Sequence, residues 1–278
     1  MNSNKIYLET TDHLVSKEKF RLEHLTETDM LVTQPIPENI SNYYDSDNYI
    51  SHTDEAKTLL EKVYQTVKKI ALKRKLALIN KYHNTSKTIL DIGCGTGEFL
   101  ITARKNNWNT LGVEINDEAR NKSSKKNITT YKFIEEVKSS QFNIITLWHV
   151  LEHLKDLNGT ITKISSLLDT DGTLIIAVPN YKSYDANYYK EYWAAYDTPR
   201  HLWQKKKKSI STIFENHNLK VVRTLPMYFD SYYVSLLSEK YKTGKSNYLK
   251  AFYRGMLSNL KAKRTGEYSS LIYVLQKA

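Results

Sequence analysis

The chain contains little cysteine, proline or glycine. Cys94 is the single cysteine among 278 residues, so this chain alone builds neither a disulfide framework nor a zinc site made of several thiolates. Only nine glycines are present, and three of them stand at positions 93, 95 and 97. Because glycine allows backbone conformations that other residues avoid, this cluster predicts a specialised turn.

Long apolar runs are also missing. No stretch approaches the roughly 20 residues that a membrane-spanning helix needs, and residues 1–7 lack the apolar centre of a signal peptide. We therefore expect a cytoplasmic protein without a membrane span. The net charge of +11 raises the question of an anionic partner such as RNA or a membrane surface. A solvated surface explains most of the scattered lysines, so a nucleic-acid partner is not favoured.

The glycine cluster follows an apolar segment, Ile89–Ile92, and precedes a helix-like one. Its rhythm, D-x-G-x-G-x-G from Asp91 to Gly97, differs from the G-x-G-x-x-G that serves a pyrophosphate. Asp91 suits a ligand that carries an ammonium group, and Gly93, Cys94 and Gly95 offer their backbone. S-adenosylmethionine is a ligand of this kind.

A second acid strengthens this prediction. Thr110–Glu114 is a short apolar strand pattern that ends in Glu114, and an acid at the end of the second strand of a βαβ unit can bind both ribose hydroxyls. Two further buried strands are predicted at 142–148 and 171–180. Strands that alternate with helical stretches indicate an open α/β sheet, mostly parallel, with helices on both faces.

Together these motifs resemble a class I S-adenosylmethionine-dependent methyltransferase of the methyltransferase-23-like branch, over roughly residues 30–278. The matching segments are 91–97, Glu114, Trp148-His149-Val150-Leu151-Glu152-His153-Leu154, 172–180 and 197–202. The resemblance implies a Rossmann-like, seven-stranded, mostly parallel sheet, with 270–275 as its antiparallel strand. It adds Ile115, Trp148, His149 and Tyr49 to the expected cofactor contacts.

The chain departs from its relatives in two places. It lacks the N-terminal zinc-binding cysteines of some of them. The segment after Ile128 also lacks a clear acid for the adenine amino group, which leaves Glu135, Glu136 or an apolar sandwich as alternatives.

The chain is expected to divide into three parts. Residues 1–84 form an N-terminal arm with an amphipathic helix from Asp54 to about Tyr82, because apolar residues recur there at helical spacing. Residues 85–225 form the methyltransferase core, and 226–278 a basic cap or dimer element and the final strand. Tyr44, Tyr49 and His52 of the arm either line the cofactor cleft or merely pack against the domain.

The acceptor is expected to meet an aromatic-rich loop at 181–208, which follows the end of a core strand. Tyr192, Trp193 and Arg200 are the predicted acceptor contacts, and His201 or Asp197 the group that takes the acceptor's proton. The alternatives are that the aromatic residues extend the core and that Arg200 simply holds Asp197.

No metal is expected, although His149, Glu152 and His153 would share a helix face and could be ligands. The predicted activity is methyl transfer to an oxygen or nitrogen of a small-molecule acceptor, by a monomer or homodimer. The alternatives are an RNA or protein methyltransferase that uses the basic surface, and a non-catalytic cofactor-binding subunit.

Overall fold

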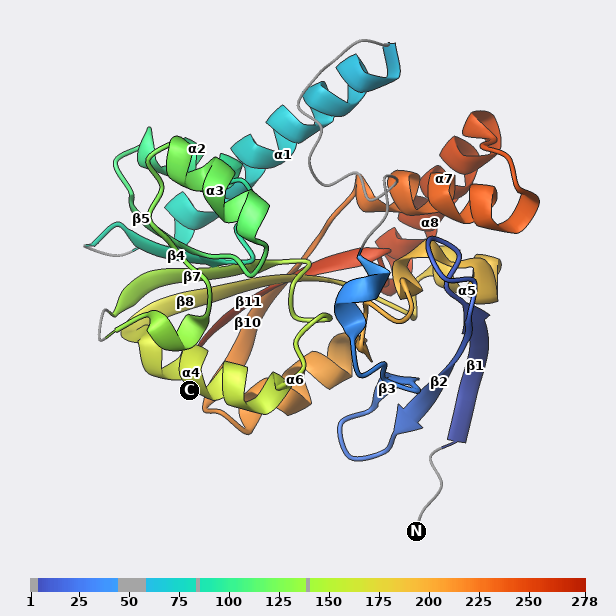
Figure 1. Cartoon of the computed structure of the whole chain (residues 1–278), viewed down its shortest axis with the longest axis horizontal. Coiled ribbons are helices and arrows are strands. Elements are labelled where there is room, and N and C mark those ends of the chain that lie inside the picture. Colours follow the sequence, from blue (N-terminus) through green and yellow to red (C-terminus); the bar gives the residue numbers. More distant parts are fainter. Residues whose placement is uncertain (1–4, 45–58, 84–85, 139–140) are drawn as a thin grey trace.

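A seven-stranded sheet forms the centre of the computed structural model, which describes residues 5–44, 59–83, 86–138 and 141–278 (Figure 1). Its strand order is β10-β11-β8-β7-β4-β5-β6. The strands, in that order, are Leu219–Pro226, Ser270–Lys277, Leu168–Pro179, Phe142–Trp148, Thr88–Ile92, Asn109–Val113 and Thr130–Tyr131. β11 is antiparallel to both its neighbours, whereas β8, β7, β4, β5 and β6 pair in parallel. The predicted Rossmann-like sheet and its antiparallel strand are confirmed.

Helices cover both faces of this sheet, with α1, α2 and α3 on one side and α4 and α6 on the other (Figure 1). They span Leu59–Tyr82, Glu98–Arg104, Asp117–Lys125, Leu157–Leu167 and Lys207–Glu215. The side chains of Asn116 and Asp156 cap α3 and α4 by accepting hydrogen bonds from Ala119 N and Gly159 N. α4 buries Ile161 and Ile164 against the sheet, whose own strands are apolar on both faces.

A second, four-stranded sheet was not predicted. It has the order β1-β2-β3-β9, with strands Lys5–Thr11, Lys19–Leu25, Met30–Gln34 and Trp203–Gln204. In β2, buried Phe20 and Leu22 alternate with exposed Lys19 and Arg21, which is the pattern of a half-buried strand. In the sequence, charged residues and turns hide this alternation, so the stretch was predicted only as an arm. A short 3-10 helix, η1 (Ile40–Tyr43), follows.

Two helices, α7 (Asp230–Thr243) and α8 (Tyr248–Thr265), form a hairpin between β10 and β11. They contact the loop after β8, which contains α5 (Tyr184–Tyr189) and the short helices η3 (Lys190–Tyr192) and η4 (Ala194–Tyr196). Another short helix, η2 (Ile134–Glu136), follows β6. Within the described ranges, no helix combines the length and the apolar character needed to cross a membrane.

Candidate functional site

The turn after β4 presents its backbone rather than side chains. Gly93, Gly95 and Gly97 have φ values of +70°, +54° and +77°, all in the left-handed region. A Cβ atom on Gly93 would lie 2.3 Å from Val150 Cγ2, so packing as well as backbone conformation requires glycine there. A Cβ on Gly95 would have no atom within 4 Å, so Gly95 borders open space.

Glu114 lies directly beside this turn. Its Oε2 accepts a hydrogen bond from Gly95 N at 2.9 Å, and its Oε1 accepts one from Asn116 N, also at 2.9 Å. These bonds orient the carboxylate at the edge where β4 and β5 end. Ile115 is 68% exposed and Phe133 is 47% exposed, and they follow the neighbouring parallel strands β5 and β6. Two apolar side chains therefore leave the sheet at the same edge, and Phe133 was not predicted.

The carboxylate of Asp91 is buried beneath the turn. Thr146 Oγ1 donates a hydrogen bond to Asp91 Oδ1 at 2.5 Å, and burial raises the pKa of Asp91 to about 6. Lys75 of α1 is close enough for its positive charge to offset part of this rise in the pKa of Asp91. Burial lowers the pKa of Lys75 to about 8, while the negative charges of Asp91 and Asp230 act in the opposite direction. Lys75 was not predicted, because in the sequence it looks like one more lysine on a helix.

Trp148, at the end of β7, joins this group. Lys75 Nζ lies 4.3 Å from the centroid of the Trp148 ring, within cation–π distance. The indole Nε1 is buried and has no hydrogen-bond partner among the described residues. Cys94 is buried too, and burial raises the pKa of its thiol, which fits the expectation that only its backbone serves the site.

His149 follows Trp148 and bridges two acids. Its φ is +58°, its Nε2 lies 3.0 Å from Asp230 Oδ2, and its Nδ1 lies 3.4 Å from Glu152 Oε1. Burial alone would lower the pKa of His149, but Asp230 and Glu152 raise it to about 10. Burial likewise disfavours the charged form of Glu152, yet the surrounding histidines hold the pKa of its carboxyl well below the usual range. His149 is thus an imidazolium between two carboxylates.

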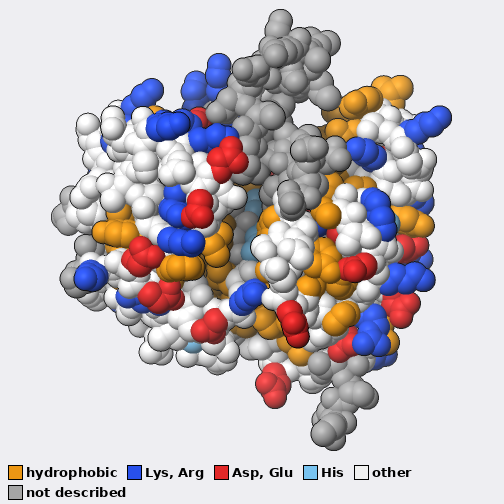
Figure 2. All heavy atoms as spheres, in the orientation of Figure 1, with side chains coloured by type: hydrophobic (Ala, Val, Ile, Leu, Met, Phe, Trp, Pro, Cys, Tyr) orange, Lys and Arg blue, Asp and Glu red, His pale blue; other side chains and the backbone are white. Residues whose placement is uncertain are grey.

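His201 approaches the same buried carboxylate from the loop after β8. Its Nε2 lies 4.0 Å from Glu152 Oε1 and 3.9 Å from Asp197 Oδ2. Its Nδ1 lies 2.8 Å from Ala195 O, and a carbonyl oxygen only accepts, so Nδ1 carries the proton. Nε2 is the ring nitrogen that faces the carboxylates of Glu152 and Asp197. Figure 2 shows a histidine side chain at the bottom of a hollow between the main sheet and the N-terminal strands.

Among the described residues, one group of side chains could hold a metal ion. Glu152, His153 and His201 each offer a ligand atom, and these atoms lie within 4.8 Å of one another. The structure thus places His201, rather than His149, with Glu152 and His153. A divalent ion there would compete with the positive charge of His149 for Glu152. The expectation that no metal is needed stays a prediction.

Arg200 is buried in an ion-pair network. It donates to Asp197 Oδ1 at 2.7 and 3.0 Å, to Asp12 Oδ1 at 3.0 Å and to the carbonyl of Tyr43 at 2.8 Å. These contacts fix the loop after β8 against the N-terminal strands. The alternative that Arg200 holds Asp197 describes the observed geometry.

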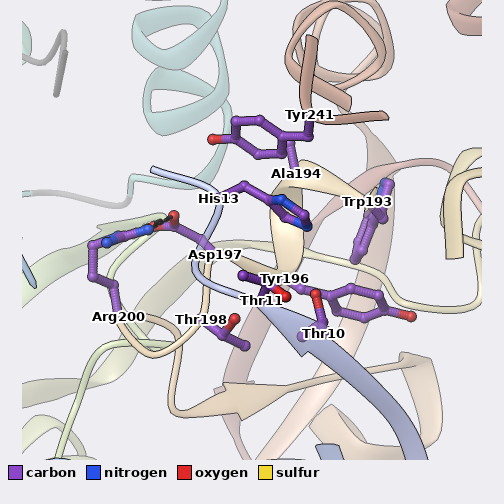
Figure 3. Close-up of a pocket in the computed structure, with 10 residues that line it drawn as sticks. All are labelled: Thr10, Thr11, His13, Trp193, Ala194, Tyr196, Asp197, Thr198, Arg200 and Tyr241. Carbon is purple, nitrogen blue, oxygen red and sulfur yellow. Dashed lines mark hydrogen bonds and ion pairs between the residues drawn. The ribbon is translucent and has the colours of Figure 1, made fainter. Parts of the chain in front are cut away.

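Two of the predicted acceptor contacts, Trp193 and Arg200, line a small cavity together with Asp197 and Tyr241 (Figure 3). Its volume of about 10 Å³ is no more than one water molecule requires. Trp193 is buried and donates from Nε1 to Asp185 Oδ2 at 2.8 Å. The Tyr192 ring lies 5.4 Å from that of His13. These residues therefore have structural partners, and their contact with an acceptor remains a prediction.

The expected residues of the arm are only partly described. The Tyr44 hydroxyl lies 2.9 Å from His153 Nδ1, beside the Glu152 group. Tyr49 and His52 lie outside the described residues. Their place at the cofactor cleft stays a prediction.

The sheet order, the glycine turn and the acid after β5 define a Rossmann-like methyltransferase fold of class I. A family model described as a methyltransferase domain matches residues 64–224, and the chain belongs to this family. No curated protein matches the chain.

Solved structures share the fold at low sequence identity. The magnesium protoporphyrin IX methyltransferase of Synechocystis PCC 6803, with bound SAH, is 14% identical with a TM-score of 0.54, covering 86% of this chain and 92% of that one. A SAM-dependent methyltransferase from Archaeoglobus fulgidus is 17% identical with a TM-score of 0.51, over 74% and 93%. The Haemonchus contortus phosphoethanolamine N-methyltransferase 2 is 15% identical with a TM-score of 0.51, over 74% and 52%.

Proposed function

We propose that this protein transfers a methyl group from S-adenosylmethionine to an oxygen or nitrogen of a small-molecule acceptor. The observation that carries the proposal is the hydrogen bond from Gly95 N to Glu114 Oε2. It places an oriented carboxylate beside an open backbone turn, at the edge of the sheet where such folds bind nucleosides. Membership of the methyltransferase-domain family supports the same conclusion.

The residues around the turn fit each part of this cofactor. Glu114 binds the ribose hydroxyls, and Ile115 packs against the adenine with Phe133 opposite, in place of the missing acid. The backbone of residues 93–97 approaches the nucleoside and the amino-acid part. Trp148 Nε1, which lacks a partner among the described residues, supplies a donor at the same edge. The complete proposed set is Asp91, Gly93, Cys94, Gly95, Gly97, Glu114, Ile115, Trp148, His149 and Tyr49.

Methyl transfer is an in-line displacement, so alignment of donor and acceptor is the main task of the enzyme. The bond from the methyl carbon to sulfur breaks and its electron pair stays on sulfur, while an acceptor lone pair forms the new bond. The acceptor's proton then needs a base. We assign this role to His201 rather than to Asp197, because Arg200 already occupies the Asp197 carboxylate.

Calorimetric titration with S-adenosylhomocysteine tests the cofactor assignment. We expect one binding site per chain, and no detectable binding would overturn the proposal. Incubation with methyl-labelled S-adenosylmethionine and a panel of hydroxyl and amine compounds then tests the acceptor class. Label found only in RNA or protein would replace the small-molecule acceptor, and cofactor binding without any transfer would indicate a non-catalytic subunit.

A further inference from the structure

Helix α8 has its small residues inside and its bulky apolar residues outside. The buried positions are Ala251, Gly255, Ser258 and Ala262. A Cβ atom on Gly255 would lie 2.8 Å from Tyr232 Cα, so the two helices of the hairpin approach each other closely at this point. In an ordinary surface helix the bulky apolar side chains pack against the core, whereas in α8 most of the bulky apolar side chains are exposed.

The outward face carries the bulky residues. Leu249 is 86% exposed and Phe252 is 61% exposed, and Tyr248, Tyr253 and Leu260 are also exposed. Leu249, Tyr253 and Leu260 are four and seven residues apart, a spacing that places them on one side of a helix. We call Tyr248, Leu249, Phe252, Tyr253 and Leu260 the α8 outer face. A contiguous apolar surface of this kind marks an interaction site.

Exposed basic residues flank this face at both ends of α8. Residues 240–265 contain eight Lys and Arg and no Asp or Glu, whereas the whole chain has a net charge of +11. Exposed Lys263 and Arg264 follow Leu260 by three and four residues, which is about one helical turn, and exposed Lys245 precedes the helix. Figure 2 shows hydrophobic and basic side chains together over the α7–α8 hairpin, at the upper right. This segment therefore holds eight of the 41 lysines and arginines of the chain without an acid between them.

We propose that the α8 outer face docks on an anionic membrane surface. A helix that presents apolar side chains flanked by lysines and arginines binds such an interface by burying the apolar face and pairing its cations with acidic headgroups. A second copy of this chain would bring two strongly basic surfaces together, which disfavours self-association through this face. RNA would satisfy the charges and its bases would stack on the aromatic rings, but it would leave Leu249 and Leu260 without an apolar partner.

Vesicle co-sedimentation of the full chain tests this proposal. We expect binding to vesicles that mix phosphatidylcholine with phosphatidylglycerol, weak binding to phosphatidylcholine alone, and weaker binding as salt increases. Leu249→Ser should reduce the apparent affinity at least about tenfold, because it removes a side chain that the interface would bury. Lys263→Gln with Arg264→Gln should also reduce it and flatten the salt dependence.

Ile6→Ser is the matched control, because Ile6 is exposed on β1, away from the hairpin. It should bind vesicles like the unaltered protein. All variants should keep their thermal midpoint and their S-adenosylhomocysteine affinity, so loss of folding is recognised separately.

The proposal is overturned if the unaltered chain does not bind anionic vesicles, or if Leu249→Ser binds them as well as Ile6→Ser does. Light scattering tests for a second copy of this chain on the face, and gel-shift measurements test for RNA. Dimerisation that Leu249→Ser abolishes, or RNA binding in place of vesicle binding, would assign the face to that partner instead.

Discussion

His149 Nε2 lies 3.0 Å from Asp230 Oδ2, and this contact joins the end of β7 to the first residue of α7. Asp230 belongs to the hairpin inserted between the last two strands of the sheet. The hairpin therefore helps to set the charge of the site. Because Glu152 lies on the other side of the same ring, the imidazolium state of His149 depends on both acids.

The first prediction concerns stability against pH. The pKa of His149 is about 10 in the folded chain, against a usual value near 6.5, so the folded state binds the extra proton between these values. This contribution to stability is complete below about pH 6.5 and is lost as the pH rises through about 10. Since the ring is about one-third exposed, we expect it to amount to about 1–2 kcal/mol.

Chemical unfolding of the unaltered protein and of His149→Gln at several pH values measures this contribution. Lys75 acts in the opposite direction, because its pKa is lowered to about 8 and its contribution therefore grows between about pH 8 and 10.5. The difference between the two proteins cancels the effect of Lys75. A difference that stays constant from pH 6 to about pH 10 would contradict the assigned imidazolium.

The second prediction concerns the cofactor. Glu114→Ala should weaken binding of S-adenosylhomocysteine by about 1.5–3 kcal/mol, as expected for hydrogen bonds to a charged group. Glu215→Ala is the control, because it removes an exposed acid from the end of α6, on the face of the sheet opposite α2 and α3. Gly95→Val should weaken this binding more than Glu114→Ala does, since it adds a side chain to the open space beside the turn and strains a positive φ. Calorimetry measures the affinities, and equal affinity in all three variants would contradict the assignment of Glu114 and the glycine turn to cofactor binding.

The third prediction separates catalysis from anchoring. Once an acceptor is known, His201→Ala should cut turnover at least about tenfold and leave S-adenosylhomocysteine affinity within about twofold, because a base acts in the transition state. Asp197→Asn tests the other candidate base and should chiefly lower thermal stability, since Arg200 loses an ionic partner. The assignment of His201 fails if His201→Ala keeps full turnover while Asp197→Asn loses it without unfolding.

The fourth prediction is that turnover needs no metal. Dialysis against a strong chelator should leave the rate unchanged, because the acids near His149 are already paired with its positive charge. If activity disappears and a divalent ion restores it, Glu152, His153 and His201 are the ligands. Glu152→Gln should then weaken metal binding in direct titration.

Local sequence patterns predicted the four parallel strands at the centre of the sheet. The number of seven strands and the antiparallel strand followed from the family resemblance, and β10 was not predicted. The strand at 142–148 and the glycine turn at 93–97 are short segments whose residue types indicate their conformation. The N-terminal strands escaped prediction because their apolar residues alternate with charges over only a few positions. Strand pairing between β3 and β9 joins parts of the chain that no local pattern connects.

The sequence by itself determined the fold class and the nucleoside-binding edge, because Asp91, the three glycines and Glu114 lie within one strand–turn–helix–strand unit. Tertiary structure decided the charge of the site and the surface of the cap. It placed Asp230 against His149, His201 against Glu152, and Lys75 over Trp148. It also turned the apolar residues of α8 outward. These relationships depend on how elements that are distant in the sequence pack together. The spacing of residues along the chain does not predict that packing geometry.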